Sequence, residues 1–175
     1  MPLTEISINN FRCFEGIEIS LSPGINFFYG ANGSGKTSIL EAVFIFSSGK
    51  SFKSSNLVSL IKHNTNNFVL KAYDGKRGYV AEIKKDKNKS ISVELNNSKI
   101  VTSKLIKEFP CTPIHNNTFS FADASPDFRR KLLDRSIFIA EEEFSKTWFS
   151  YHRALKQRNH MLKNNRISDI YAWNN

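Results

Sequence analysis

Residues 30–37 read Gly30-Ala31-Asn32-Gly33-Ser34-Gly35-Lys36-Thr37, which is the Gly-x-x-x-x-Gly-Lys-Thr pattern of a P-loop. An apolar run over residues 25–29 leads into this loop and predicts a strand. After the loop, apolar residues recur at helical spacing from Ile39 to Phe46, and Gly49 is a suitable helix end. The predicted order of strand, glycine loop and helix is the setting that this motif requires.

The residue types of the loop indicate what it binds. Glycines let successive backbone N–H groups turn inward, and a helix that starts at Thr37 points its positive end at the same place. We expect Lys36 to bind β- and γ-phosphates, the Thr37 hydroxyl to bind Mg²⁺, and Ser38 to donate to an α-phosphate. The loop therefore predicts binding of ATP or another nucleoside triphosphate with Mg²⁺. The alternative is a glycine-rich turn with a structural role only.

Most of the remaining chain before residue 124 has the alternation of a sheet. Strands are expected over residues 3–8 and 17–21. Three short alternating runs, 67–73, 78–84 and 90–95, are separated by polar turns and predict an antiparallel meander. We also expect a short helix over 102–109 and a strand over 111–114. The predicted class is α/β.

The last third of the chain is predicted to be helical. Ser125-Pro126-Asp127 combines a serine cap, a proline at the first helical position and an acid near the positive end of the helix dipole. A helix should run from there to about Ala140. A second helix should begin near Glu142 and pack its apolar side against a neighbouring helix. That side is formed by Phe144, Trp148, Tyr151, Leu155 and Leu162.

The composition is that of a globular protein with an excess of basic residues. The chain has 175 residues, 25 Lys and Arg against 16 Asp and Glu, and a formal net charge of +9. This balance favours a polyanionic partner, and residues 144–168 contain six basic residues and no acidic one. A solvated helix face is the competing explanation. No apolar run reaches the length of a membrane span and the first residues lack a secretory pattern, so we expect a cytoplasmic protein without a membrane partner.

Several blocks together make the chain similar to the RecF family, a group of bacterial DNA-repair ATPases related to SMC proteins and ABC-type ATPases. The blocks are Ile8-Asn9-Asn10-Phe11-Arg12-Cys13-Phe14, the P-loop with Ser38-Ile39-Leu40-Glu41-Ala42, Gly49-Lys50-Ser51-Phe52-Lys53, residues 126–134, and residues 148–159. The resemblance implies an ABC-ATPase-like head lobe over residues 1–124, with a P-loop, a mixed sheet and the meander. It implies that residues 125–175 begin an α-helical lobe.

The same resemblance carries functional expectations. It implies ATP-dependent homodimerisation on duplex or gapped DNA, slow ATP hydrolysis by the full-length protein, and work with RecO and RecR. The setting would be recombinational repair at single-strand gaps and stalled replication forks, within DNA replication and the SOS response to DNA damage. In such heads the arginine that matches Arg12 lies beside the nucleotide, so we expect a supporting contact from it; an exposed arginine after a strand is the alternative.

Two departures from the family pattern bear on catalysis. Asn116-Asn117 stands where RecF relatives usually carry Pro-Glu, and Asp123 is a weak candidate for a metal ligand. The signature motif, acidic strand end and switch histidine of ABC-type heads are expected beyond residue 175. We therefore expect no catalytic residue within this chain, and ATP binding without appreciable hydrolysis.

The candidate DNA contacts all fall in the predicted helices: Arg129, Arg130, Arg153, Lys156 and Arg158. Arg129 and Arg130 would stand in the first turns of a helix, where the dipole disfavours cations. An ion pair between Arg130 and Asp134 at i,i+4 is the competing explanation for Arg130.

Two other functional classes remain open at this stage. One is a self-sufficient P-loop NTPase or kinase unrelated to DNA, which would need a guanine-specificity element or an arginine-rich lid. The other is a basic DNA-binding module with a vestigial nucleotide site, against which intact Lys36 and Thr37 argue.

Overall fold

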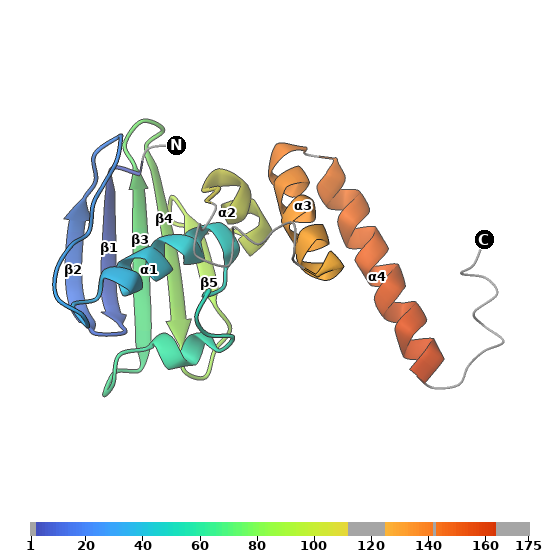
Figure 1. The fold of residues 1–175 in the computed structure, drawn as a ribbon, viewed down its shortest axis with the longest axis horizontal. Coiled ribbons are helices and arrows are strands. Elements are labelled where there is room, and N and C mark those ends of the chain that lie inside the picture. The colour runs from blue at the N-terminus through green and yellow to red at the C-terminus, as the bar shows by residue number, and fades with distance from the viewer. Residues whose placement is uncertain (1–2, 112–124, 142, 164–175) are drawn as a thin grey trace. The chain divides into compact units, whose positions relative to one another are not determined.

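The computed structural model describes residues 3–111, 125–141 and 143–163 (Figure 1). The chain divides into two compact units, residues 1–118 and residues 119–175. The first unit carries the sheet, and the second carries helices α3 and α4. The domain boundary expected between residues 124 and 125 adjoins residues 112–124, which lie outside the described residues, so it stays a prediction. Most of the strand expected over 111–114, together with Asn116-Asn117 and Asp123, lies outside them too.

The first unit is built on a six-stranded sheet with the order β2-β1-β3-β4-β5-β6. Its strands are β1 (Glu5–Phe11), β2 (Phe14–Ser20), β3 (Asn67–Asp74), β4 (Tyr79–Asp86), β5 (Ser92–Leu95) and β6 (Ser98–Lys99). Every described pairing is antiparallel, so the parallel part of the expected mixed sheet is not among the described residues. The opening strands and the meander are confirmed, and so is the α/β class.

The core lies on one face of this sheet because the strands alternate. On β3, Phe68, Leu70 and Ala72 are buried, and on β4, Ala81 and Ile83 are buried beside them. Helix α1 (Lys36–Ser48) lies across the sheet in Figure 1 and adds its own buried apolar side chains to the same cluster. Burying one such leucine or isoleucine stabilises the fold by roughly 1.5–3 kcal/mol. The P-loop helix is therefore anchored directly on the sheet.

Short elements complete the first unit. Helix α1 ends as expected at Gly49, whose backbone is left-handed and whose N–H donates to the Ile45 carbonyl over 2.8 Å. A 3₁₀ helix, η1 (Leu57–Leu60), follows, and the expected short helix is confirmed as α2 (Thr102–Glu108). Its Leu105 is fully buried and α2 contacts α1.

The strand expected over residues 25–29 is wrong, because this segment forms no regular secondary structure. Ile25, Phe27 and Tyr29 are 78%, 81% and 93% exposed, and only Phe28 packs against the core cluster. A strand needs a neighbour for its backbone N–H and C=O groups, and none of the described strands pairs with this segment. Apolar composition alone does not supply that neighbour.

A cluster of charged residues, of which Asp74 is buried, ties the β3–β4 turn to the end of α2. Arg77 donates from Nε to Asp74 Oδ2 over 2.6 Å and from Nη1 to Glu108 Oε2 over 2.8 Å. Its guanidinium also lies 4.4 Å from the ring centroid of Tyr79. Burial acts to raise the pKa of Asp74, but the hydrogen bonds and charge of Arg77 outweigh burial and hold that pKa below its usual value. The cluster is thus electrostatically satisfied.

The second unit contains α3 (Pro126–Ala140) and α4 (Phe144–Lys163). The predicted cap is confirmed, since the Ser125 hydroxyl accepts a hydrogen bond from the Phe128 N–H. The two helices meet through Phe138, whose ring lies in edge contact with Trp148 and Phe149. No described residue of either helix is fully buried.

Two expectations for the helices are wrong in detail. Tyr151 and Leu162 of the apolar side of α4 are exposed rather than packed, because α3 covers only part of that side. Arg130 does not pair with Asp134. It lies 3.9 Å from Asp127, one turn towards the helix start. Asp134 instead accepts a hydrogen bond from Trp148 Nε1 of α4 over 3.1 Å.

Candidate functional site

A pocket of about 550 Å³ lies beside the P-loop in the first unit. It is lined by the tip of the β1–β2 hairpin, the P-loop with the first turn of α1, and the segment that follows α1. The lining residues are Arg12, Cys13, Asn32, Gly33, Gly35, Lys36, Thr37, Ser38, Lys53, Ser59 and Ile61. Three of these are cations and none is an acid, so the pocket is suited to an anion.

The backbone of the loop explains two of its glycines. Gly33 and Gly35 have φ values of 84° and 93°, a left-handed conformation that side chains disfavour. At Gly35 an added Cβ would also lie 2.4 Å from the Phe14 ring. Glycine at position 35 therefore lets α1 begin directly against the hairpin tip. The N–H groups of the first turn of α1, which carry the positive end of the helix dipole, lie at the pocket.

The side chains predicted from the P-loop pattern meet at this pocket. Lys36 Nζ donates to the carbonyls of Gly30 and Ala31, over 2.9 and 2.8 Å, which leaves one of its three ammonium donors for a further acceptor. Thr37 and Ser38 line the pocket from the same helical turn. Gly30, Ala31 and Ser34 belong to the loop without lining the pocket. The described residues contain no cluster of three metal-ligating side chains.

Arg12 lines the same pocket as the P-loop, and its expected contact with a nucleotide stays a prediction. It occupies the two-residue loop between β1 and β2 and has φ of 54°, a strained value for a residue with a side chain. Two contacts hold this loop: the Arg12 N–H donates to the Leu60 carbonyl, and the Lys62 N–H donates to the Asn10 carbonyl, both over 2.8 Å. The segment after α1 thus fixes the hairpin tip against the P-loop.

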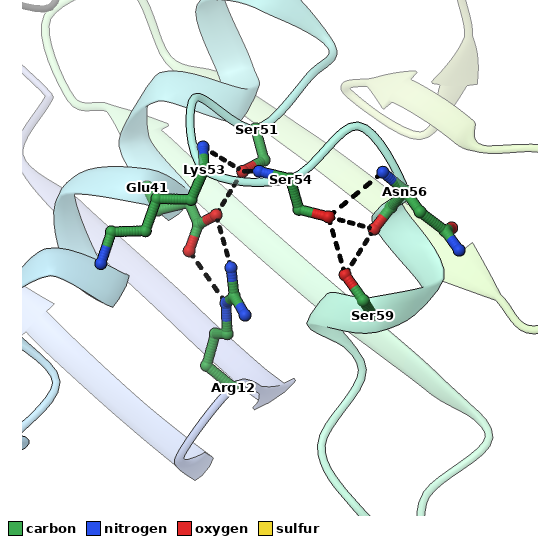
Figure 2. Close-up of polar contacts among 7 residues, drawn as sticks. All are labelled: Arg12, Glu41, Ser51, Lys53, Ser54, Asn56 and Ser59. Carbon is green, nitrogen blue, oxygen red and sulfur yellow. Dashed lines mark hydrogen bonds and ion pairs between the residues drawn. The ribbon is translucent and has the colours of Figure 1, made fainter.

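Glu41 connects Arg12 to the P-loop helix (Figure 2). Its carboxylate accepts hydrogen bonds from Arg12 Nε and Nη2, each over 3.0 Å, and the residue is 1% exposed. The Ser51 hydroxyl donates to the same carboxylate. Ser51 in turn accepts hydrogen bonds from the backbone N–H groups of Lys53 and Ser54, each over 2.9 Å. One buried acid therefore organises two different parts of the pocket wall.

No sequence pattern had indicated functional roles for Glu41, Ser51 or Lys53. A signal was present for Glu41, because it stands one turn before Ile45 on the buried side of an otherwise apolar helix. A charged residue at such a position requires a partner. Its partner is 29 residues away in the sequence, which only the fold reveals.

The candidate DNA contacts belong to the other unit. Arg129 and Arg130 lie on α3, and Arg153, Lys156 and Arg158 lie on α4. Arg130 and Lys131 both face the Asp127 carboxylate, so the acid that compensates these cations comes from their own helix. Arg153 and Lys156 are exposed, and no ion pair joins them to another described residue. No helix in the described part of the chain is long and apolar enough to span a membrane.

Residues 1–174 match the family model described as the AAA ATPase domain. Among curated proteins, the DNA replication and repair protein RecF of Edwardsiella ictaluri is 34% identical over 178 aligned positions, covering 99% of this chain and 50% of that protein. The RecF of Haemophilus ducreyi is 35% identical, covering 99% of this chain and 49% of that protein. The chain thus spans about half the length of these curated relatives, and the resemblance to RecF seen in the sequence is confirmed.

Solved structures agree with this resemblance. A structure of the recombination mediator protein RecF with ATP in the RecFOR pathway superposes with a TM-score of 0.83 and 25% identity, covering 97% of this chain and 49% of that chain. A structure of an SMC ATPase superposes with a TM-score of 0.61 and 21% identity, covering 76% of this chain and 98% of that one. The second likeness shows the fold alone, and it confirms the ABC-type head expected from the sequence.

Proposed function

The chain belongs to the AAA ATPase domain family, and from this premise we propose that its P-loop pocket binds ATP together with Mg²⁺. One observation carries the proposal. Two P-loop glycines, Gly33 and Gly35, line a single pocket together with the N-terminus of α1 and three cations, Arg12, Lys36 and Lys53, and no described carboxylate lines it. This is a site for a polyphosphate rather than for a cation or an apolar ligand.

Each predicted residue has a defined role in this proposal. Backbone N–H groups of residues 30–37 cradle the phosphates, Lys36 supplies a charge to the β- and γ-phosphates, and Ser38 donates to the α-phosphate. The Thr37 hydroxyl suits Mg²⁺, which prefers oxygen ligands and completes its octahedron with phosphate oxygens and water. When bound, the metal would neutralise phosphate charge. Because no described carboxylate lines the pocket, we propose binding without appreciable hydrolysis for residues 1–175.

The wider function that we propose follows the relatives. Two curated relatives are DNA replication and repair proteins by name, and a similar solved structure is that of RecF with ATP in the RecFOR pathway. We assign this chain to the ATP- and DNA-binding part of such a recombinational repair protein in the cytoplasm. DNA, RecO, RecR and a second copy of the full-length protein are its proposed partners. The basic surface of α4 is the proposed DNA contact.

Calorimetric titration with ATP and Mg²⁺ tests the nucleotide proposal. Wild type should bind, and Lys36→Ala should abolish measurable binding because it removes the charge aimed at the phosphates while leaving the backbone cradle in place. Lys87→Ala is the matched control, since Lys87 lies in the exposed turn between β4 and β5 and does not line the pocket. Equal affinity of wild type and Lys36→Ala would remove the site assignment.

A further inference from the structure

One of the three cations at the pocket, Arg12, is paired directly with a buried acid. Arg12 donates two hydrogen bonds to Glu41 in a bidentate pair, and these are the side-chain hydrogen bonds that the described structure gives Arg12. A guanidinium has five N–H donors in a fixed fork. Its other donors remain for an anion in the pocket, and the Glu41 pair fixes their direction.

Lys53 is held through the backbone of its own turn. The Ser51 hydroxyl bonds to the Glu41 carboxylate and accepts the N–H groups of Lys53 and Ser54, as Figure 2 shows. A second hydrogen-bond network follows in the chain. In it the Ser54 and Ser59 hydroxyls lie 2.8 Å apart and both donate to the Asn56 carbonyl. The exposed Lys53 side chain therefore leaves from a fixed backbone and lines the pocket.

We propose that Glu41 is a positioning residue that presents Arg12 and Lys53 to the phosphates of the ligand, with Ser51 as the link to Lys53. The inference rests on the proposed ATP site and extends it with a cationic wall, formed by Arg12 and Lys53, that lines the same pocket as the P-loop. Glu41 itself touches neither phosphate nor metal in this arrangement, since it is buried and does not line the pocket. Its charge is instead used by Arg12 and Ser51.

The main test compares Glu41→Gln with Glu82→Gln by calorimetric titration with ATP and Mg²⁺. Glu82 is a matched control because it is also paired to a cation, Lys71 at 3.2 Å, but does not line the pocket or contact Arg12. Glu41→Gln keeps the side-chain size and loses the bidentate acceptor, so its Kd should rise about tenfold, as expected for one charge-assisted interaction. Glu82→Gln should stay within about twofold of wild type.

A role in folding alone would give a different result. Loss of folded protein lowers the fraction of binding sites in the titration and leaves the Kd of the remaining sites unchanged. A tenfold higher Kd at full stoichiometry would therefore support positioning. A wild-type Kd in Glu41→Gln, at either full or reduced stoichiometry, would overturn it.

Variants of Ser51 test the role of Lys53 separately from that of Arg12. Ser51→Ala should weaken ATP binding severalfold, and Ser51→Thr, which keeps the hydroxyl, should restore it. In a double-mutant cycle, Lys53→Ala should cost less affinity in the Ser51→Ala background than in wild type, because Lys53 is already unfixed. Strictly additive losses would contradict the link between Ser51 and Lys53.

The same variants distinguish this inference from the proposed function. If wild type fails to bind ATP, the nucleotide proposal falls, and inorganic tripolyphosphate becomes the probe. Weaker tripolyphosphate binding by Glu41→Gln than by Glu82→Gln would still support the cationic wall. Equal or absent tripolyphosphate binding in wild type and both variants would overturn it.

Discussion

The two units of the chain hold their charged groups in different ways. In the sheet unit, Glu41 and Asp74 are buried, and each is paired with an arginine: Glu41 with Arg12 across the fold, and Asp74 with Arg77 of the same turn. In the helical unit no described residue of α3 or α4 is buried, and the ion pairs of Asp127 join exposed neighbours on α3. The pocket geometry is thus set by a core, whereas the candidate DNA surface rests on charge alone. The effect of a substitution at the pocket can therefore be predicted for each residue. At the candidate DNA surface only the effect of the total charge can be predicted.

The largest expected difference between the units is in their cores. Leu70→Ala in β3 should lower the free energy of unfolding of the sheet unit by about 2–5 kcal/mol, because Leu70 is completely buried. Phe138→Ala in α3 should cost the helical unit about 1 kcal/mol, since its environment is half exposed. Urea unfolding would measure both losses. Circular dichroism reports on both units, and Trp148 fluorescence in a Trp173→Phe background reports on the helical unit. Equal losses would contradict the contrast.

Substitutions in the P-loop should give the next largest effect. Gly35→Ala combines a left-handed backbone with a 2.4 Å approach to the Phe14 ring, and should destabilise the sheet unit by about 3 kcal/mol. Gly33→Ala has a similar φ but open space, and should cost about 1 kcal/mol. Thermal unfolding of both variants measures the difference. Similar losses would show that the hairpin tip moves freely away from α1.

Acid should destabilise the sheet unit through Asp74. Because its pKa is lowered in the folded state, Asp74 contributes stability that is present above its unfolded pKa, about 4, and is lost as the pH falls through the folded pKa. Asp74→Asn should be less stable than wild type at pH 7, and it should lose less stability than wild type between pH 5 and 2. The urea midpoint, measured as a function of pH, gives both comparisons.

The matched control lies in the helical unit. The hydrogen bond and charge of Lys131 lower the pKa of Asp127, but Asp127 is exposed and solvent screens its ion pair. Asp127→Asn should therefore leave the acid profile of the urea midpoint nearly unchanged. A profile as strongly altered as that of Asp74→Asn would mean that exposed pairs matter as much as buried ones in this protein.

The affinity for DNA should change least when residues are substituted, because it is spread over many weak contacts. The Arg153→Glu/Lys156→Glu double variant should weaken duplex binding and lower the slope of log K against log salt by about two units. Lys87→Glu/Lys89→Glu in the sheet unit is the matched charge reversal. Fluorescence anisotropy from low to physiological salt would compare them. A loss confined to the sheet-unit variant would move the DNA contact to that unit.

Local patterns were sufficient to predict most elements of this fold. Period-two alternation predicted β3, β4 and β5, and the cap at Ser125 and the end at Gly49 followed from chemistry within four residues. Features that depend on distant partners could not be predicted in this way. The pairing of Arg12 with Glu41 needs the hairpin tip to meet α1, and the hydrogen bond of Asp134 needs Trp148 from another helix.

The exposed segment from Ile25 to Tyr29 has a practical consequence for handling the protein. The side chains of Ile25, Phe27 and Tyr29 project into water beside backbone that no described strand covers. Such a segment attracts extended chains of other molecules, since added strands satisfy both the backbone and the apolar groups. We therefore expect preparations of residues 1–175 to associate as concentration rises, by a route that starts at the approach to the P-loop. Self-association and nucleotide binding would then involve adjacent residues, and one could alter the other. Light scattering should therefore accompany every titration.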